Sequence, residues 1–261
     1  MRFTRAIVRP PGGNFAHGLT SASAGPPDLE EALGQHRRYC DALRGCGLEL
    51  TSLEPDLRFP DGTFVEDAAV VTARGAILTR PGAPTRIGEI DSVGGALDAF
   101  FAHKLGIAAP GTVDGGDVCE IDGHFLIGVS ARTNDAGAGQ LAQHLRQLGY
   151  SASIVDIRAS KTLLHLKTGI AYLGEGVGLV GAGIERELAP MSGFGIRELI
   201  AVSAEESYAA NCVRVNESVL MPAGYPRIAA ALRERGFRPL LLEMSEYKKM
   251  DGGLSCLSLR F

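Results

Sequence analysis

Five stretches of this sequence resemble one another, and their recurrence limits the folds that the chain can adopt. Each stretch begins with small or polar residues and continues into an apolar run with period-two alternation. In the first four, a short turn containing Gly, Asn or Glu leads to a second apolar run. Alternation of this kind, interrupted by turns, predicts pairs of β-strands. The five stretches are residues 59–80, 112–130, 163–183, 207–224 and 248–261.

One polar residue marks the register of each stretch. Successive markers are separated by 50, 48, 46 and 45 residues. A repeat of this length predicts similar structural modules, arranged in a closed ring or an open array. The markers are Asp67, Asp117, His165, Asn211 and Cys256. Helices are expected at residues 28–47, 90–106, 135–150 and 225–237, with a weaker one at 183–195.

The two ends of the chain complement each other in this repeat. The fifth stretch ends at Phe261 after a single apolar run, so its second strand is missing. The segment MRFTRAIVRP, residues 1–10, could supply that strand. Such pairing would close a ring, which has no open repeat face to cap. The alternative is an ordinary α/β protein, in which strands and helices also alternate at a similar spacing.

The composition is that of a soluble globular protein. Apolar residues make up 45% and charged residues 21% of the 261 residues, and the net charge is −4. Neither a basic run nor an apolar membrane-length stretch is found, which argues against nucleic-acid and membrane partners. Five cysteines without a CxxC pair indicate neither a disulfide framework nor a zinc knuckle, and no secretion signal is found. We therefore expect one domain over residues 1–261, in the cytoplasm.

Equivalent modules in a ring would bring their marker residues together near the axis. Cys256 and His165 would then share one cavity, and a thiol beside an imidazole is an arrangement for nucleophilic catalysis. Each residue also has an ordinary structural explanation. Cys256 lies in an apolar run, where most cysteines are inert core residues. His165 is flanked by leucines, and a histidine in such a run is usually a hydrogen-bonded core residue.

Several acidic residues fall within the same stretches. Glu66 and Asp67 are adjacent, and in an extended strand they would point to opposite faces, leaving one of them solvated. Asp114, in VDGGD, also fits a glycine turn with a capping Asp. Carboxylates near a thiol raise its pKa and suppress the thiolate. The combination favours a cationic substrate, and we expect the thiol to stay protonated until that cation binds.

Two arginines extend this hypothesis about the substrate. Arg86 and Arg132 could bind an anionic group elsewhere on the ligand, through bidentate contacts to a carboxylate. A cationic head with a carboxylate tail describes an amino acid such as arginine. Surface salt bridges are the ordinary alternative for both side chains.

Nine short motifs together carry a family resemblance that covers nearly the whole chain. They are HGLTSA, RFPDGTFVED, TRPGAPTRIGE, VDGGD, GVSARTN, LHLKTG, YAANC, MPAGYPR and MDGGLSC. With them the chain resembles the dimethylarginine dimethylaminohydrolases, guanidino-modifying enzymes of the pentein fold. The resemblance implies a five-bladed α/β propeller of ββαβ modules around a central channel. It also implies hydrolysis of Nω-methylated arginines to citrulline and a methylamine, through a covalent S-alkylthiouronium intermediate on cysteine.

The resemblance assigns roles position by position. Cys256 is similar to the nucleophile of the family and His165 to its general acid and base. Asp114 resembles the acid that partners the histidine and faces the guanidinium, although some members carry Glu there. No role is implied for Asp117. The implied ligand contacts are Glu66 and Asp67 for the guanidinium, Asp61 and the Leu19 backbone for the α-amino group, Arg86 and Arg132 for the α-carboxylate, and Met250 in the wall of the site.

Further expectations concern the surroundings of the site. Residues 17–28, rich in Gly, Ser and Pro, resemble the mobile loop that covers the channel in this family. The implied reaction needs no metal or organic cofactor. A homodimer is compatible with the sequence, in which we identify no interface. The choice among dimethylarginine, monomethylarginine and arginine depends on the shape of the pocket.

Two alternatives stay open. One is arginine deiminase activity, with ammonia as the leaving group, which in a related family belongs to longer chains with a helical insertion. The other is a non-catalytic binding or assembly factor of the same architecture. Such a factor would not need a cysteine, a histidine and an acid at equivalent module positions, so their joint presence favours an enzyme.

Overall fold

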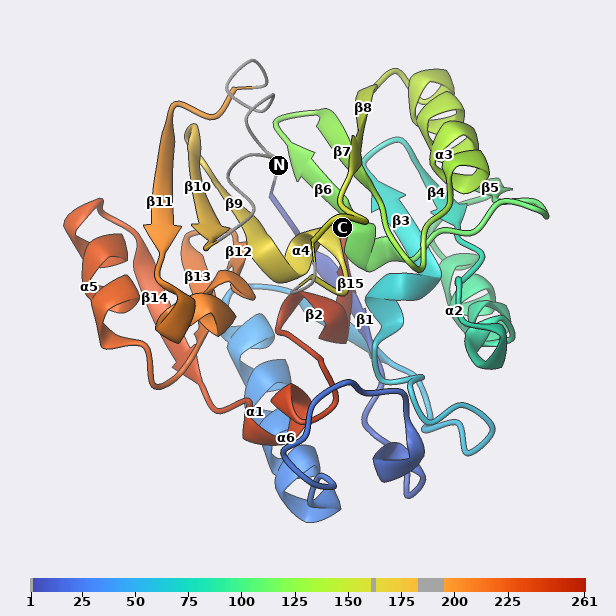
Figure 1. The fold of residues 1–261 in the computed structure, drawn as a ribbon. Helices are drawn as coiled ribbons and strands as arrows, with labels where there is room; N and C mark the ends of the chain where they lie inside the picture. The colour runs from blue at the N-terminus through green and yellow to red at the C-terminus, as the bar shows by residue number, and fades with distance from the viewer. Residues whose placement is uncertain (1, 161–162, 183–194) are drawn as a thin grey trace.

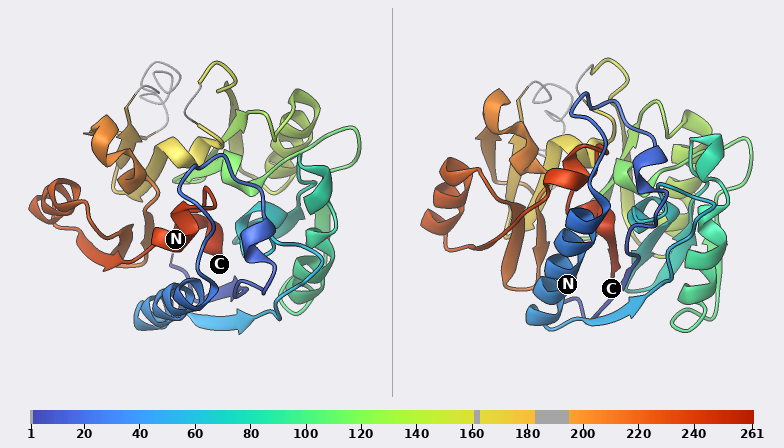
Figure 2. Two further views of the ribbon diagram at one scale, coloured as in Figure 1. Left: turned by 60° about the horizontal axis from the view of Figure 1, so that its bottom comes forward. Right: turned by 90° about the horizontal axis from the view of Figure 1, so that it is seen from below.

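The computed structural model describes residues 2–160, 163–182 and 195–261. Five three-stranded sheets surround a common centre, and the longer helices lie on the outside of this ring (Figures 1 and 2). This arrangement confirms the predicted α/β propeller of five modules.

All five sheets share one topology. The first strand pairs antiparallel with the second, and the second pairs parallel with the third. A parallel third strand needs a crossover connection, which a helix typically provides. The sheets are β3 (Ala69–Thr72), β4 (Gly75–Leu78) and β5 (Lys104–Gly106); β6 (Val118–Ile121), β7 (His124–Val129) and β8 (Ser151–Asp156); β9 (Ile170–Gly174), β10 (Val177–Gly181) and β11 (Glu198–Val202); β12 (Val213–Val215), β13 (Ser218–Pro222) and β14 (Arg238–Leu242); and β15 (Ser258–Arg260), β1 (Arg5–Val8) and β2 (Glu49–Ser52).

Two of the crossover helices begin at residues whose side chains cap them. The Asp28 side chain accepts a hydrogen bond from the amide of Glu31, and Asn134 accepts one from Gly137. Such caps satisfy amide groups that the first helical turn leaves unpaired. The crossover helices are α1 (Leu29–Gly45), α2 (Glu89–Leu97), α3 (Asp135–Gln147) and α5 (Pro226–Glu234), and a short helix α6 (Ser245–Lys248) precedes the last module turn. The weaker helix expected at 183–195 lies, except for its final residue, outside the described residues.

The two ends of the chain complete one module together. Strand β15 pairs antiparallel with β1, with Ala6 opposite Arg260 and Val8 opposite Ser258. The backbone amide of Arg5 also donates to the carbonyl oxygen of Phe261 at 2.8 Å. The predicted closure of the ring by the N-terminal segment is therefore confirmed.

A short helical turn leads into the first strand of every module. Neighbouring turns contact one another in the order η7, η2, η4, α4 and η6 around the centre. Each of the five marker residues lies on one of these turns or caps it, so the markers converge as predicted. The turns are η2 (Val65–Ala68), η4 (Gly115–Asp117), α4 (Leu166–Gly169), η6 (Ala204–Ala210) and η7 (Ser255–Leu257).

Two local expectations about these positions are wrong. Glu66 and Asp67 lie in a 3₁₀ turn and not in an extended strand, and both are buried, with 3% and 4% of their surface exposed. Cys256 likewise lies in the 3₁₀ turn before β15 and not within a strand. With about three residues per turn, a 3₁₀ helix does not send consecutive side chains to opposite faces, so both carboxylates can remain inside.

Apolar side chains fill the layer between a sheet and its crossover helix in the modules whose helix is described. In the second module, for example, Ile127 of β7 and Leu141 of α3 are fully buried in the same cluster. Each such side chain contributes about 1.5–3 kcal/mol by leaving water. The core is thus divided among the modules, which leaves the ring centre to polar residues. Among the described residues, no helix is long and apolar enough to cross a membrane.

Candidate active site

His165 and Asp114 form a buried pair at the ring centre. His165 is the N-cap residue of α4, and its Nε2 lies 3.0 Å from Oδ2 of Asp114, which is fully buried. Gly116 makes this approach possible, because a Cβ at that position would lie 2.9 Å from the imidazole ring. The double glycine of VDGGD therefore does more than make a turn: it brings the carboxylate and the imidazole together.

The imidazole lies in a negative field. Burial alone would lower the pKa of His165, but the charge of Asp67, the hydrogen bond that the imidazole donates to Asp114 and the charge of Asp117 outweigh burial and raise that pKa to about 9. A histidine with this pKa is a cation at neutral pH. It can therefore donate a proton to a leaving group.

Asp67 is the second acid beside the imidazole. Its Oδ1 accepts from the amide of Gly116 at 2.8 Å, and its Oδ2 accepts from Nη1 of Arg86 at 2.7 Å. Burial would raise the pKa of this carboxyl, but the nearby Arg86 charge outweighs burial and lowers the pKa to about 2. Ligand atoms of Asp67, Asp114 and His165 lie within 4.8 Å of one another. A metal ion would need the neutral imidazole, so binding one here would require His165 to lose its proton.

Cys256 lies on η7, which contacts η2. Burial and the negative charges of Glu66 and Asp67 raise the pKa of its thiol to about 12. The thiol is therefore protonated near neutral pH in the free protein. Asp67 thus acts on both Cys256 and His165, which places the thiol and the imidazole in one electrostatic environment.

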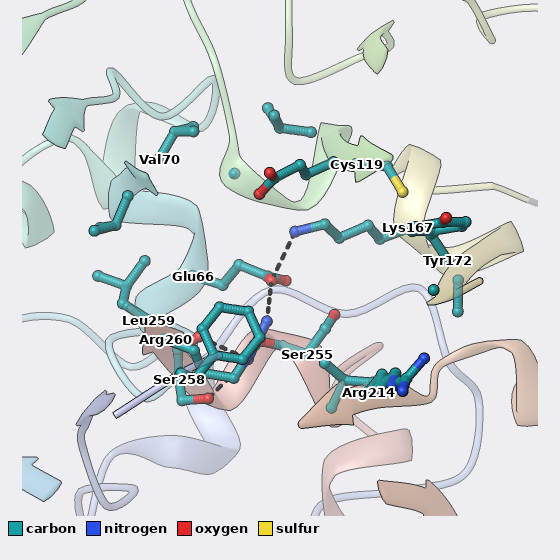
Figure 3. Close-up of a pocket in the computed structure, with 18 of the residues that line it drawn as sticks. Glu66, Val70, Cys119, Lys167, Tyr172, Arg214, Ser255, Ser258, Leu259 and Arg260 are labelled. Atoms are coloured by element: carbon teal, nitrogen blue, oxygen red, sulfur yellow. Dashed lines mark hydrogen bonds and ion pairs between the residues drawn. The ribbon is translucent and has the colours of Figure 1, made fainter. Parts of the chain in front are cut away.

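Glu66 is paired with two cations of the chain. Its Oε1 accepts from Nζ of Lys167 at 2.8 Å and lies 3.4 Å from Nη2 of Arg260 (Figure 3). These ion pairs lie in a cavity of about 530 Å³, which Ser255 and Cys119 also line. The other carboxylate oxygen of Glu66 is buried and has no hydrogen-bond partner among the described residues. Sequence reasoning did not single out either cation, although Lys167 follows His165 by two positions in LHLKTG.

Leu19, Asp61 and Met250 come together at one end of the covering loop. The amide of Leu19 donates to both carboxylate oxygens of Asp61, at 3.0 and 3.2 Å. A Cβ on the intervening Gly18 would lie 2.6 Å from Oδ1 of Asp61 and 3.1 Å from Cε of Met250, so the loop packs closely here. Burial raises the pKa of Asp61, against the opposing charges of two arginines.

Those arginines, Arg86 and Arg132, differ in their pairing. Arg86 is the last residue of η3 (Pro84–Arg86) and is buried. Its Nε and Nη2 donate to Glu89 at 2.8–3.2 Å, in addition to its bond with Asp67. The pairing of Arg86 with Glu89 was not predicted from the sequence, although a spacing of three residues suits an ion pair on one helical turn. Arg132, in contrast, has a buried Nη1 with no hydrogen-bond partner within the described parts of the chain.

Hydrogen bonds hold both ends of the loop that follows η1 (Phe15–His17). Oγ1 of Thr20 donates to the carbonyl of Lys249 at 2.8 Å, and Ser21 donates to the Asp251 carboxylate from its amide and its hydroxyl. The far end is held where the amide of Asp28 donates to Glu246 at 2.6 Å. The loop that was expected to cover the channel therefore contacts the segment that leads to Cys256.

Comparison with known proteins identifies the family. The chain is 46% identical over 260 residues to the dimethylarginine dimethylaminohydrolase of Pseudomonas aeruginosa, covering 99% of this chain and 100% of that protein. The chain belongs to the dimethylarginine dimethylaminohydrolase family. The enzyme of this name from Streptomyces coelicolor is 35% identical, with 98% and 96% of the two chains covered.

Solved structures agree with membership in the dimethylarginine dimethylaminohydrolase family. A Pseudomonas aeruginosa enzyme in complex with citrulline, studied as a cysteine-to-serine mutant, superposes with a TM-score of 0.94 at 44% identity, covering both chains fully. The N-terminal domain of a cyanobacterial arginine dihydrolase shares the fold, with a TM-score of 0.86 at 18% identity and coverage of 98% and 97%. The sequence model of the arginine deiminase family also matches residues 63–191.

Proposed function

We propose that this protein hydrolyses Nω-methylated arginines to citrulline and a methylamine, with Cys256 as the nucleophile and His165 as the general acid and base. The observation that carries the proposal is the shared negative field of Asp67. It faces a protonated thiol on one side and, on the other, an imidazolium paired with Asp114. A relative 46% identical over 99% of this chain bears the name of that activity.

The charge of the site supports a cationic substrate. A guanidinium placed among the carboxylates of Glu66, Asp67 and Asp114 would offset the charge that keeps the Cys256 thiol protonated. The pKa of the thiol then falls, and its proton leaves to solvent. The substrate thus activates the nucleophile that attacks it, and the thiolate forms only when the guanidinium carbon is in place.

The chemistry then follows in two steps. The thiolate of Cys256 attacks the central guanidinium carbon to form a tetrahedral adduct. His165 protonates the departing amine, because an amine leaves poorly as an anion, and an S-alkylthiouronium remains on the sulfur. His165 next takes a proton from water, and the resulting hydroxide attacks the same carbon. The C–S bond breaks and the new hydroxyl group loses its proton to solvent, which releases citrulline and the thiolate.

The polar groups at the loop support binding of an amino-acid backbone. Arg132 offers a buried, unpartnered Nη1, at least within the described residues, which suits a carboxylate. Arg86 lies nearby, but its bonds with Glu89 and Asp67 leave it fewer free donors. Asp61, next to the Leu19 amide, provides the matching acceptor for an α-ammonium group, and Met250 closes the wall.

Arginine deiminase activity is the second candidate, because the model of that family matches about half of the chain. A citrulline assay with dimethylarginine, monomethylarginine and arginine side by side separates the possibilities. We expect citrulline from the methylated substrates. Turnover of arginine alone would indicate a deiminase, and no citrulline from any substrate would favour a non-catalytic binding protein.

A further inference from the structure

Asp117 is a fully buried carboxylate at the end of η4 for which the proposed chemistry has no direct use. Both of its carboxylate oxygens accept hydrogen bonds. Oδ1 accepts from the amide of Leu166 at 2.9 Å, and Oδ2 accepts from Oγ of Ser130 and Oγ1 of Thr133, both at 2.7 Å. These three donors lie on two different segments of the chain, so one carboxylate joins the second module, which contains β6–β8, to the third, which contains β9–β11.

Each of these donors is adjacent to a residue of the candidate site. Leu166 directly follows His165, so its bond with Asp117 holds the backbone that carries the imidazole. Thr133 accepts, through Oγ1, from the amide of Asp114 at 3.1 Å, which holds the partner of that imidazole.

The second hydroxyl reaches the carboxylate-binding end of the site. Oγ of Ser130 donates to Asp117 and accepts from the amide of Arg132 at 3.0 Å and from that of Thr133 at 3.1 Å. Asp117 is therefore linked to the backbone segments that carry His165, Asp114 and Arg132. Each link is either one direct hydrogen bond or a pair of hydrogen bonds that share one hydroxyl group.

Packing leaves this network little freedom to relax. A Cβ at Gly128, on β7, would lie 3.0 Å from the Cβ of Leu166 and 3.2 Å from Oδ1 of Asp117. Close contacts of this kind exclude water and fix the distance between η4 and α4. The network is thus rigid enough to transmit a change at Asp117 to His165.

We infer that Asp117 is a positioning residue, which holds the imidazole, its carboxylate partner and Arg132 in register for hydrolysis. This inference rests on the proposed function. Asp117 acts through Leu166, Thr133 and Ser130 and touches no reacting atom. Only a group that accepts at every position satisfies all three donors, because an amide in its place would turn an N–H toward either the hydroxyls or the Leu166 amide.

The charge of Asp117 supplies a second measurable signature. The charged groups that face His165 are Asp67 from η2, and Asp114 and Asp117 from η4, and all three raise the pKa of the imidazole. Replacing Asp117 with Asn removes one of them without removing the side chain. The pKa of His165 should then fall, even though the Asp114 pair is chemically intact.

The decisive variants are Asp117→Asn and the matched pair Thr133→Val and Thr133→Ser. We expect Asp117→Asn to lower kcat by about 10- to 100-fold, since small misplacements of catalytic groups cost on the order of 10²-fold. Thr133→Val should lower kcat in the same direction, and Thr133→Ser, which keeps the hydroxyl, should restore most of it. Ser130→Ala should mainly raise KM, because that hydroxyl holds the backbone of Arg132.

Two readouts separate this inference from the proposed function. Citrulline release by the wild type tests the function alone. The ring titration of His165, followed by NMR and assigned with His165→Gly, tests Asp117 without any turnover. A lower pKa of His165 in Asp117→Asn, with the kcat losses above, supports the inference. An unchanged titration, or Thr133→Val as active as Thr133→Ser, overturns it, and the Thr133 pair decides if Asp117→Asn does not fold.

Discussion

Nε2 of His165 lies 3.0 Å from Oδ2 of Asp114, and the two side chains meet at the ring centre, where 8% and 0% of their residues' surfaces are exposed. The pair joins the second and third module turns of the site, because Asp114 precedes η4 and His165 caps α4. It keeps a protonated imidazole inside the protein at neutral pH, where the proposed reaction needs an acid.

The raised pKa of His165 predicts a pH dependence of stability. Its pKa in the folded protein is about 9, above the ordinary value of 6.5. The stabilisation is fully present below pH 6.5 and is lost as the pH rises through about 9. Urea unfolding of the wild type should therefore show a falling free energy across this window. His165→Gly should lack this part of the slope, and parallel curves for the two proteins would contradict the assignment.

The thiol of Cys256 should react slowly with iodoacetamide in the free protein. Its pKa of about 12 predicts an alkylation rate that keeps rising through neutral and mildly alkaline pH. Mass spectrometry of the peptide that carries Cys256 separates it from Cys46, which is also partly exposed. A rate that is already constant below pH 7 would mean a preformed thiolate and would rule out activation by the substrate.

Asp67→Asn should shift the pKa values of both Cys256 and His165. Without that charge the pKa values of Cys256 and His165 both fall, so alkylation of the thiol becomes faster at a given pH. Binding of the cation should weaken, and KM should rise about tenfold or more, which corresponds to roughly 1.4 kcal/mol or more. Glu54→Gln, at an exposed position, is the matched loss of one charge. Equal alkylation rates in the two variants would contradict the shared field.

Gly116→Ala tests the close approach on which the site depends. The added Cβ would lie 2.9 Å from the His165 ring and 3.1 Å from Oδ1 of Asp67, so the variant should lose most activity and about 1–3 kcal/mol of stability. Gly139→Ala is the control, because nothing lies within 4 Å of its Cβ on α3. That change should leave activity intact and stabilise the helix by about 0.5–1 kcal/mol. Full activity in Gly116→Ala would show that the imidazole does not need this position.

The ring could be predicted because the modules that form it recur at a regular interval in the sequence. Markers at intervals of 45–50 residues, with a last module lacking a strand, already indicated that β15 would pair with β1. What the pattern could not predict was the local geometry at the centre. Glu66 and Asp67 share a 3₁₀ turn because tertiary contacts bend the chain there, and period-two alternation carries no signal for a single turn.

The ion pairs of Glu66 could not be predicted from the sequence either. Lys167 and Arg260 meet Glu66 from segments 101 and 194 residues away, and no local pattern encodes such a contact. Asp117 was recognised as a repeat marker, yet its contacts depend on two hydroxyls and an amide that only the fold brings together.

The proposed mechanism depends on a covalent intermediate on Cys256, which rapid-quench mass spectrometry can detect. The enzyme is mixed with dimethylarginine, stopped with acid within its first turnovers and digested. We predict a transient adduct on the Cys256 peptide. Its added mass should equal that of the substrate minus dimethylamine, and it should persist longer in His165→Gly. Citrulline release by Cys256→Ser at the wild-type rate would contradict it.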